Sequence, residues 1–219
     1  MSLLYTDPEL IKYYCMSFKK LKPVLKSTLE EMGFESANAF QKKALPKIKS
    51  GADLYLIAPR NSGKTTALII SVIQQLNAEA FEDSPRALIF VKDKEAALAL
   101  EEKFRDFTSE TDLRVYSAYD EQNIDDQKDA IYYGVDIVIA TPQRLSKLFS
   151  MTGIHLGQLK MFVIEDAEFI SRGGHLNHIL RIPLSISKCQ YLVFGESMEP
   201  KMERLQEQFM DRAQIIKMK

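Results

Sequence analysis

The chain has 219 residues, of which 46% are hydrophobic and 27% are charged, a composition that excludes a disordered or fibrous protein and fits one globular domain. Its formal net charge of −1 argues against a domain that holds nucleic acid by bulk electrostatics, so nucleic-acid contacts would need a local basic strip. Cys15 and Cys189 lack metal-site spacing, and no apolar run is long enough to span a bilayer. We therefore expect free thiols, no membrane and a cytoplasmic location.

The first fifty residues are predicted to form a helical preface. Asp7 and Pro8 indicate the start of one helix, because Asp is a common N-cap residue and Pro is tolerated at the first helical position. A second helix is predicted to begin near Pro23 and to stop at Gly33, which can adopt the left-handed conformation that ends a helix. Its apolar face is formed by Leu25, Leu29 and Met32.

After Gly51 the sequence alternates between short apolar runs and segments with helical periodicity. The runs predicted to be strands are 54–58, 87–91, 137–140, 161–164, 191–194 and 214–217. The segments predicted to be helices are 65–76, 95–107, 145–149 and 202–209. This alternation predicts an α/β fold with a mostly parallel central sheet, helices on both faces, and ligands at the carboxyl ends of the strands.

The turn after the first predicted strand has the sequence of a phosphate-binding loop, 58–65. A triphosphate needs backbone N–H groups at a helix N-terminus, a glycine that lets the main chain approach, a lysine and a hydroxyl for Mg²⁺. Gly63, Lys64 and Thr65 supply the last three. The residues expected to hold the nucleotide here are Pro59, Arg60, Asn61, Ser62, Gly63, Lys64, Thr65 and Thr66.

Two positions of this loop depart from the usual pattern. Ala58 replaces the first glycine, and Asn61 stands where another glycine is common, although Asn tolerates a positive φ better than most residues. The alternative is that residues 62–65 are only a turn that leads into a helix. The apolar strand before the turn favours the phosphate-binding interpretation.

The strand 161–164 ends in two acids, Glu165 and Asp166. Next to the phosphate loop, one carboxylate can hold Mg²⁺ through water and the other can orient or deprotonate the attacking water. We therefore predict Lys64, Glu165 and Asp166 as catalytic residues, with Thr65 and Glu165 on the Mg²⁺ side. The alternative for the two acids alone is a solvated strand end.

In the order of its motifs the sequence resembles the first RecA-like domain of DEAD-box RNA helicases, from about Phe18 to the C-terminus. Residues 58–65 match motif I, and residues 163–168 occupy the place of Asp-Glu-Ala-Asp. Gly33-Phe34 followed by Phe40-Gln41 looks like the Q motif, which implies that Gln41 reads adenine and that Phe18 stacks on it. The bound nucleotide would then be ATP. The alternative for these two residues is a buried aromatic and a polar helix residue.

The segment 141–144, Thr-Pro-Gln-Arg, resembles the family's Thr-Pro-Gly-Arg nucleic-acid motif, which implies that Thr141 and Arg144 contact RNA. The alternative is a helix start with Thr141 as N-cap and Pro142 at the first position. Asp93 and Asp120 replace family residues on this side, and both would repel phosphates. We therefore expect RNA to bind weakly.

The resemblance also predicts weak chemistry. The acids read Glu-Asp-Ala-Glu at 165–168, so each of the first two side chains differs by one methylene from the family's pattern. A misplacement near 1 Å can cost on the order of 10²-fold in rate. Glu196 stands where the family has Ser-Ala-Thr, and the family's second RecA-like domain, with its arginine fingers, is missing from residues 1–219. A second domain in cis or a protein partner in trans would have to supply those groups.

Three functions compete at this point. The first is an ATP-binding helicase-like domain, with residues 1–50 packed on a RecA-like domain of residues 51–219. The second is a catalytically retired interaction module that keeps the fold and the nucleotide and assists another protein. The third, a P-loop enzyme such as a small-molecule kinase, is disfavoured by the arrangement around Gln41.

Overall fold

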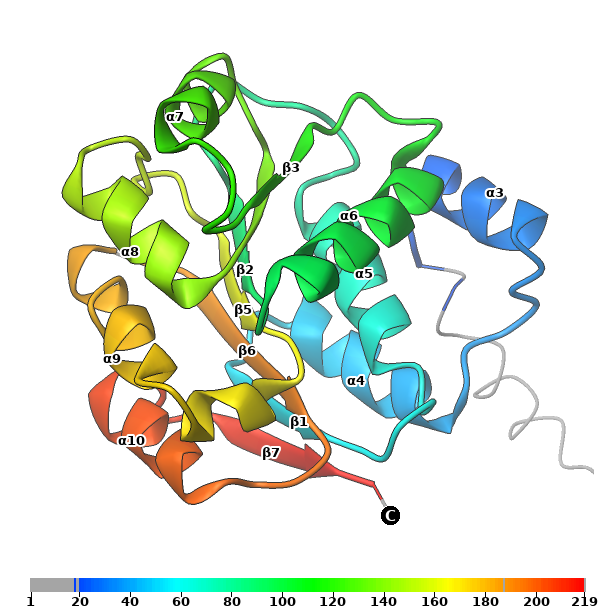
Figure 1. The fold of residues 1–219 in the computed structure, drawn as a ribbon. Helices are drawn as coiled ribbons and strands as arrows, with labels where there is room; N and C mark the ends of the chain where they lie inside the picture. The colour runs from blue at the N-terminus through cyan, green and yellow to red at the C-terminus, as the bar shows by residue number, and fades with distance from the viewer. Residues whose placement is uncertain (1–17, 19, 187, 219) are drawn as a thin grey trace, which may run out of the picture.

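The computed structural model describes residues 18, 20–186 and 188–218, and its centre is a seven-stranded sheet (Figure 1). In spatial order the strands are β3 (Val115–Ala118), β4 (Ile137–Ala140), β2 (Ala87–Phe90), β5 (Met161–Ile164), β6 (Gln190–Gly195), β1 (Leu54–Ile57) and β7 (Gln214–Lys217). Every neighbouring pair is parallel. The predicted mostly parallel sheet is confirmed, and the observed sheet has no antiparallel pair among the described residues.

Helices cover both faces of the sheet, which explains why its inner strands are continuous apolar runs. One face carries α3 (Pro23–Glu31), α4 (Ala39–Lys49), α5 (Lys64–Gln75) and α6 (Lys94–Thr108). The other carries α7 (Ile124–Tyr132), α8 (Pro142–Ser150), α9 (His175–Leu180) and α10 (Pro200–Gln208), with the short 3-10 turns η1 (Ala167–Ser171) and η2 (Pro183–Ser185). Each face has its own apolar core, so the sheet is buried on both sides.

The two helices before the sheet belong to the first of these cores. Gly33 ends the segment after α3 with φ +78°, as predicted. Leu25 and Leu29 are buried at 0% and 1% exposure, but Met32 is not on the buried face. It is the C-cap residue of α3, just past the last helical residue, and is 39% exposed. The helix predicted at Asp7 lies outside the described residues.

Helix α4 begins with a complete capping box. The Asn38 side chain accepts a hydrogen bond from the Gln41 backbone N–H, and the Gln41 side chain accepts one from the Asn38 backbone N–H. This pair satisfies two donors that the first turn of a helix otherwise leaves free. The start of α4 is thereby fixed next to the phosphate loop.

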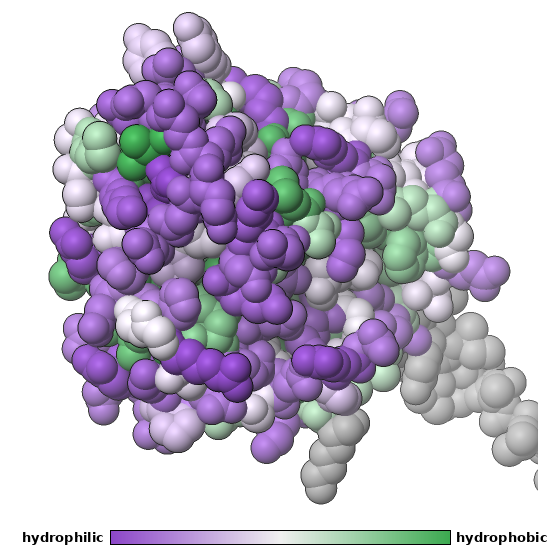
Figure 2. Space-filling model, viewed as in Figure 1, coloured by the Kyte–Doolittle hydropathy of each residue, from purple (hydrophilic) through white to green (hydrophobic). Residues whose placement is uncertain are grey.

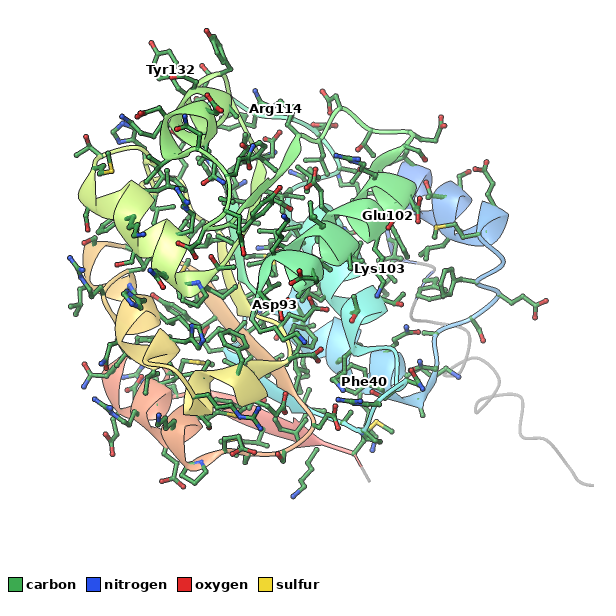
Figure 3. All side chains as sticks on the ribbon, in the orientation of Figure 1. Phe40, Asp93, Glu102, Lys103, Arg114 and Tyr132 are labelled. Atoms are coloured by element: carbon green, nitrogen blue, oxygen red, sulfur yellow. The ribbon has the colours of Figure 1, made fainter. Side chains whose placement is uncertain are left out.

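A buried ion cluster joins the ends where β2, β3 and β4 begin. The Asp136 side chain, 0% exposed, accepts hydrogen bonds from the guanidinium groups of Arg86 and Arg114. In Figure 3, Arg114 lies near the top of the molecule, whereas Asp93 lies at the start of α6, after the far end of β2. The cluster therefore organises the end of the sheet opposite to the phosphate loop.

The surface carries no extensive apolar region on the face seen in Figure 2, where hydrophilic residues dominate and apolar ones occur in small groups. Among the described residues, no helix combines the length and the apolar character that crossing a membrane requires. Cys189 is a free thiol, as predicted, whereas Cys15 lies outside the described residues.

Candidate nucleotide-binding site

The phosphate loop leaves the carboxyl end of β1 and enters α5 directly. Two of its residues adopt the left-handed conformation, Asn61 with φ 58° and Gly63 with φ 82°. This confirms the expectation that Asn61 tolerates a position where glycine is common. Gly63 is the N-cap of α5 and has no side chain to cap it, so the first N–H groups of the helix stay available for an anion.

Lys64 is held inside the loop. Its side chain is buried, with the residue 7% exposed, and Nζ donates to the carbonyl oxygens of Ala58 at 2.7 Å and Pro59 at 3.0 Å. The loop therefore wraps around the ammonium group, and a phosphate oxygen would approach it in competition with these two carbonyls. The Ser62 hydroxyl in the same loop is buried without a hydrogen-bond partner. A buried donor left unpaired is unfavourable, and a phosphate oxygen would satisfy it.

The start of α4 packs against this loop. Asn38 Nδ2 donates to the Ser62 carbonyl at 3.0 Å, and Gln41 Nε2 lies 3.5 Å from the Gly63 carbonyl. A Cβ atom built on Gly63 would lie 2.4 Å from Asn38 Nδ2 and 2.8 Å from Gln41 Nε2. Glycine is therefore favoured at position 63, because φ is positive there and a side chain would displace the ends of the Asn38 and Gln41 side chains.

Gln41 is 3% exposed, so its amide is placed by the capping box and by the loop. Phe18 is 9% exposed and belongs to the apolar core. That burial matches the alternative of a buried aromatic, and its stacking on adenine stays a prediction. The contact from Asn38 to the loop was missed, although an Asn followed three residues later by Gln is a helix-start signature.

The strand end of β5 meets the phosphate loop, as the sequence predicts. Thr65 Oγ1 donates to Glu165 Oε1 at 2.8 Å. Burial raises the pKa of Glu165 to about 7, the Thr65 hydrogen bond lowers it, and the charge of Asp166 raises it further. A hydroxyl and a carboxylate are oxygen ligands of the kind that Mg²⁺ prefers, with phosphate and water completing its shell. The pair therefore fits the expected Mg²⁺ side of an ATP site.

The next two acids along the chain are Asp166 and Glu168. Asp166 adopts the left-handed conformation with φ 45°, which a short Asp side chain tolerates better than a longer one. Glu168 Oε1 accepts hydrogen bonds from the backbone N–H groups of Glu196 and Ser197 after β6. Glu168 thus ties the end of β5 to the end of β6.

Arg60, at the tip of the phosphate loop, pairs with the same segment after β6. Its Nε lies 2.7 Å from Glu196 Oε1, and both side chains are exposed. The hydrogen bond and the charge of Glu196 raise the pKa of Arg60. Sequence reasoning missed this pair because its members are 136 positions apart. An exposed pair adds little stability, but it occupies a guanidinium that was expected to hold phosphate.

Thr141 and Arg144 lie apart from the phosphate loop, at the start of α8. Both are buried, at 7% and 5% exposure. Thr141 does stand at the N-cap position, but its side chain makes no capping hydrogen bond. Its hydroxyl donates to Asp120 Oδ2 at 3.0 Å instead. The predicted helix start, with Thr141 at the N-cap and Pro142 in the first turn, is therefore confirmed, and only the capping hydrogen bond of the Thr141 side chain is missing.

The parallel sheet and the loop after β1 define a P-loop domain of the RecA-like α/β type. The chain belongs to the DEAD/DEAH box helicase family, whose model matches residues 38–205. It is 28% identical over 203 residues to the ATP-dependent RNA helicase DeaD of Buchnera aphidicola subsp. Schizaphis graminum, covering 92% of this chain and 33% of that protein.

A second curated relative and a solved structure are also similar to this chain. The ATP-dependent RNA helicase DeaD of Escherichia coli strain K12 is 27% identical over 90% of this chain and 31% of its own length. The crystal structure of a DEAD box protein from the hyperthermophile Methanococcus jannaschii superposes with a TM-score of 0.82 at 21% identity, covering 91% of this chain and 55% of that one. The chain thus spans about a third of the length of the two curated relatives.

Proposed function

We propose that the chain is an ATP-binding domain that acts as the N-terminal half of an ATP-dependent RNA helicase and hydrolyses ATP weakly without a partner. The observation that carries this proposal is the 2.8 Å contact between Thr65 and Glu165, which joins the phosphate loop to the acidic strand end. Lys64, inside the loop, and the unpartnered Ser62 hydroxyl support it. These groups bring hydrogen-bond donors for phosphate and oxygen ligands for Mg²⁺ together in one place.

Adenine selection is assigned to Gln41, whose amide is buried against the phosphate loop. A carboxamide both donates and accepts, so it can pair with the amino group and the adjacent ring nitrogen of adenine. Guanine carries a carbonyl oxygen where adenine carries its amino group. Discrimination therefore depends on the amide oxygen of Gln41, which accepts from the amino group and repels the guanine carbonyl, and it is lost when the carboxamide is removed.

Isothermal titration with Mg²⁺ and either ATP or GTP tests this assignment. We expect the native chain to bind ATP at least about tenfold more tightly than GTP, because the wrong base leaves buried polar groups unpaired. Gln41→Ala removes both the acceptor and the donor of the carboxamide, so the preference should disappear. Equal affinities of the native chain for both nucleotides would show that the proposal is wrong.

Hydrolysis is expected to be slow because Glu165 and Asp166 stand where the family has Asp followed by Glu, so each side chain differs in length by one methylene. The double variant Glu165→Asp with Asp166→Glu should raise the ATPase rate, by up to about 10²-fold if side-chain reach is the defect. Unfolding of the variant should be measured in parallel, since Asp166 has φ 45° and Glu tolerates that conformation less well. The assay includes saturating Mg²⁺ and ATP.

A retired nucleotide-binding module that assists another protein is the second candidate. The occupation of Arg60 by Glu196 favours it, because that guanidinium is then shared with an acid. A folded double variant that binds ATP and still shows no increase in turnover would support retirement. Activity that appears only when a second RecA-like domain is added, in cis or in trans, would support the helicase half.

A further inference from the structure

The loop after β3, residues 119–122, lies over the N-terminal end of α8. Thr141 Oγ1 donates to Asp120 Oδ2 at 3.0 Å, and the other carboxylate oxygen lies 3.7 Å from Arg144 Nε and 3.8 Å from Lys147 Nζ. Arg144 Nη2 also donates to the Asp120 carbonyl and, at 3.0 Å, to the Gln122 carbonyl. One carboxylate is thus surrounded by a hydroxyl, a guanidinium and an ammonium group.

These groups together have the chemistry of an anion pocket. A hydroxyl, an arginine, a lysine and the start of a nine-residue helix are the donors that proteins use for phosphate oxygens. Their geometry toward Asp120 is incomplete, since Arg144 Nε and Asp120 Oδ1 are buried without a hydrogen-bond partner. The buried guanidinium N–H therefore points to an anion larger than the single carboxylate that now faces it.

The loop is fixed from its other side as well. Gln127, which is 0% exposed, donates to the Tyr119 carbonyl and to the Gln122 side chain, each at 3.0 Å. Lys94 Nζ lies 5.3 Å from the centre of the Tyr119 ring. Asp120 is therefore held in the pocket by its own loop, and leaving it would require these contacts to break.

We propose that Asp120 fills a pocket of Thr141, Arg144 and Lys147 that would otherwise bind a phosphodiester group, so that the chain's own carboxylate keeps nucleic acid off α8. This inference rests on the proposed function in taking nucleic acid as the ligand. A phosphate that enters must displace a carboxylate of like charge, and neutralising that carboxylate opens the pocket. Asp120 is in this sense a specificity-determining residue, and α8 retains the groups for binding.

Fluorescence anisotropy with a labelled single-stranded oligouridine RNA tests the proposal. Asp120→Ala should bind the RNA about tenfold or more tightly than the native chain, as expected when charge-assisted hydrogen bonds become available. Its log K against log salt plot should steepen by about 0.7 for each phosphate gained. Asp120→Asn, which keeps the shape of the side chain, should give a smaller gain in affinity. Native-like thermal unfolding of both variants confirms that they fold.

Two controls separate the pocket from a change in net charge. Asp129→Asn alters the charge of the chain equally but lies exposed on α7, so it should leave RNA affinity unchanged. Lys147→Gln, at a side chain that is 53% exposed, should abolish the gain of Asp120→Ala, because it removes one of the cations of the pocket. An equal gain from Asp129→Asn, or a gain that survives Lys147→Gln, would overturn the proposal.

The RNA titration tests the pocket proposal, and the ATP titration tests the proposed function independently of it. If Asp120→Ala binds RNA no better than the native chain while Mg²⁺-ATP binding is intact, the pocket proposal is overturned and the ATP-binding function stands. If the native chain binds no ATP but Asp120→Ala gains RNA affinity, the ATP-binding function is overturned and the pocket proposal stands.

Discussion

Glu165 should make the free energy of unfolding depend on pH, and the substitution Glu165→Gln should remove that dependence. Its pKa is raised from 4.5 to about 7, mainly by burial, so the folded state holds a proton that the unfolded state has already lost between those pH values. The free energy of unfolding should therefore fall as pH rises through this window. A rise of this size corresponds to about 3 kcal/mol of stability, which is fully present below about pH 4.5 and fully lost above about pH 7.

Glu165→Gln has no charge to bury and keeps an oxygen that can accept the Thr65 hydroxyl. Urea unfolding of both proteins, without nucleotide or Mg²⁺, gives the difference in free energy at pH 5 and pH 8. We expect the variant to be more stable than the native chain by up to about 3 kcal/mol at pH 8 and nearly equal to it at pH 5. Other titrating groups occur in both proteins, so they cancel in the difference.

Glu207→Gln is the matched control, because Glu207 is an exposed carboxyl on α10. Its difference from the native chain should stay within about 0.5 kcal/mol at both pH values. A Glu165→Gln difference that does not change between pH 5 and pH 8 would refute the reasoning, since it would mean that Glu165 titrates alike in the folded and unfolded chains.

Two further predictions concern the parts of the fold around the site. Burial opposes ionisation of Asp136, but hydrogen bonds from Arg114 and Arg86 hold its pKa below the ordinary value, so Asp136→Asn should cost about 3–5 kcal/mol in urea unfolding; a loss below 1 kcal/mol would show that the cluster is not structural. Asn38→Ala removes the cap of α4 and a contact to the Ser62 carbonyl, and should cost about 1 kcal/mol. Asn38→Ser, which retains a capping oxygen, should recover most of this loss.

The strands of the inner sheet were predictable because they are buried on both faces. The runs 137–140, 161–164 and 214–217 match β4, β5 and β7, and the other predicted strands agree with the structure within one residue. The edge strand β3 was missed because Val115 and Tyr116 are only partly buried and the segment has no continuous apolar signal. The spatial order of the strands is set by packing between distant segments, so no local pattern predicts it.

The candidate site also contains residues that local sequence predicts and contacts that it does not predict. Lys64, Thr65 and Glu165 could be found from local patterns, since a phosphate loop and an acidic strand end each follow an apolar run. The contacts of Asn38 and Arg60 were not predicted, because each joins segments that only the fold brings together. Local sequence thus indicates which groups are present, and the fold determines how they are paired.

Titration of Mg²⁺-ATP into the native chain and into Lys64→Ala tests the central claim most directly. The claim is that the loop after β1 binds a triphosphate through the Lys64 ammonium group, which the loop now holds by two carbonyl oxygens. We predict that the native chain binds and that Lys64→Ala binds at least about tenfold more weakly, as expected for loss of a charge-assisted hydrogen bond. Equal binding by the two proteins, or no binding by a folded native chain, would contradict the account.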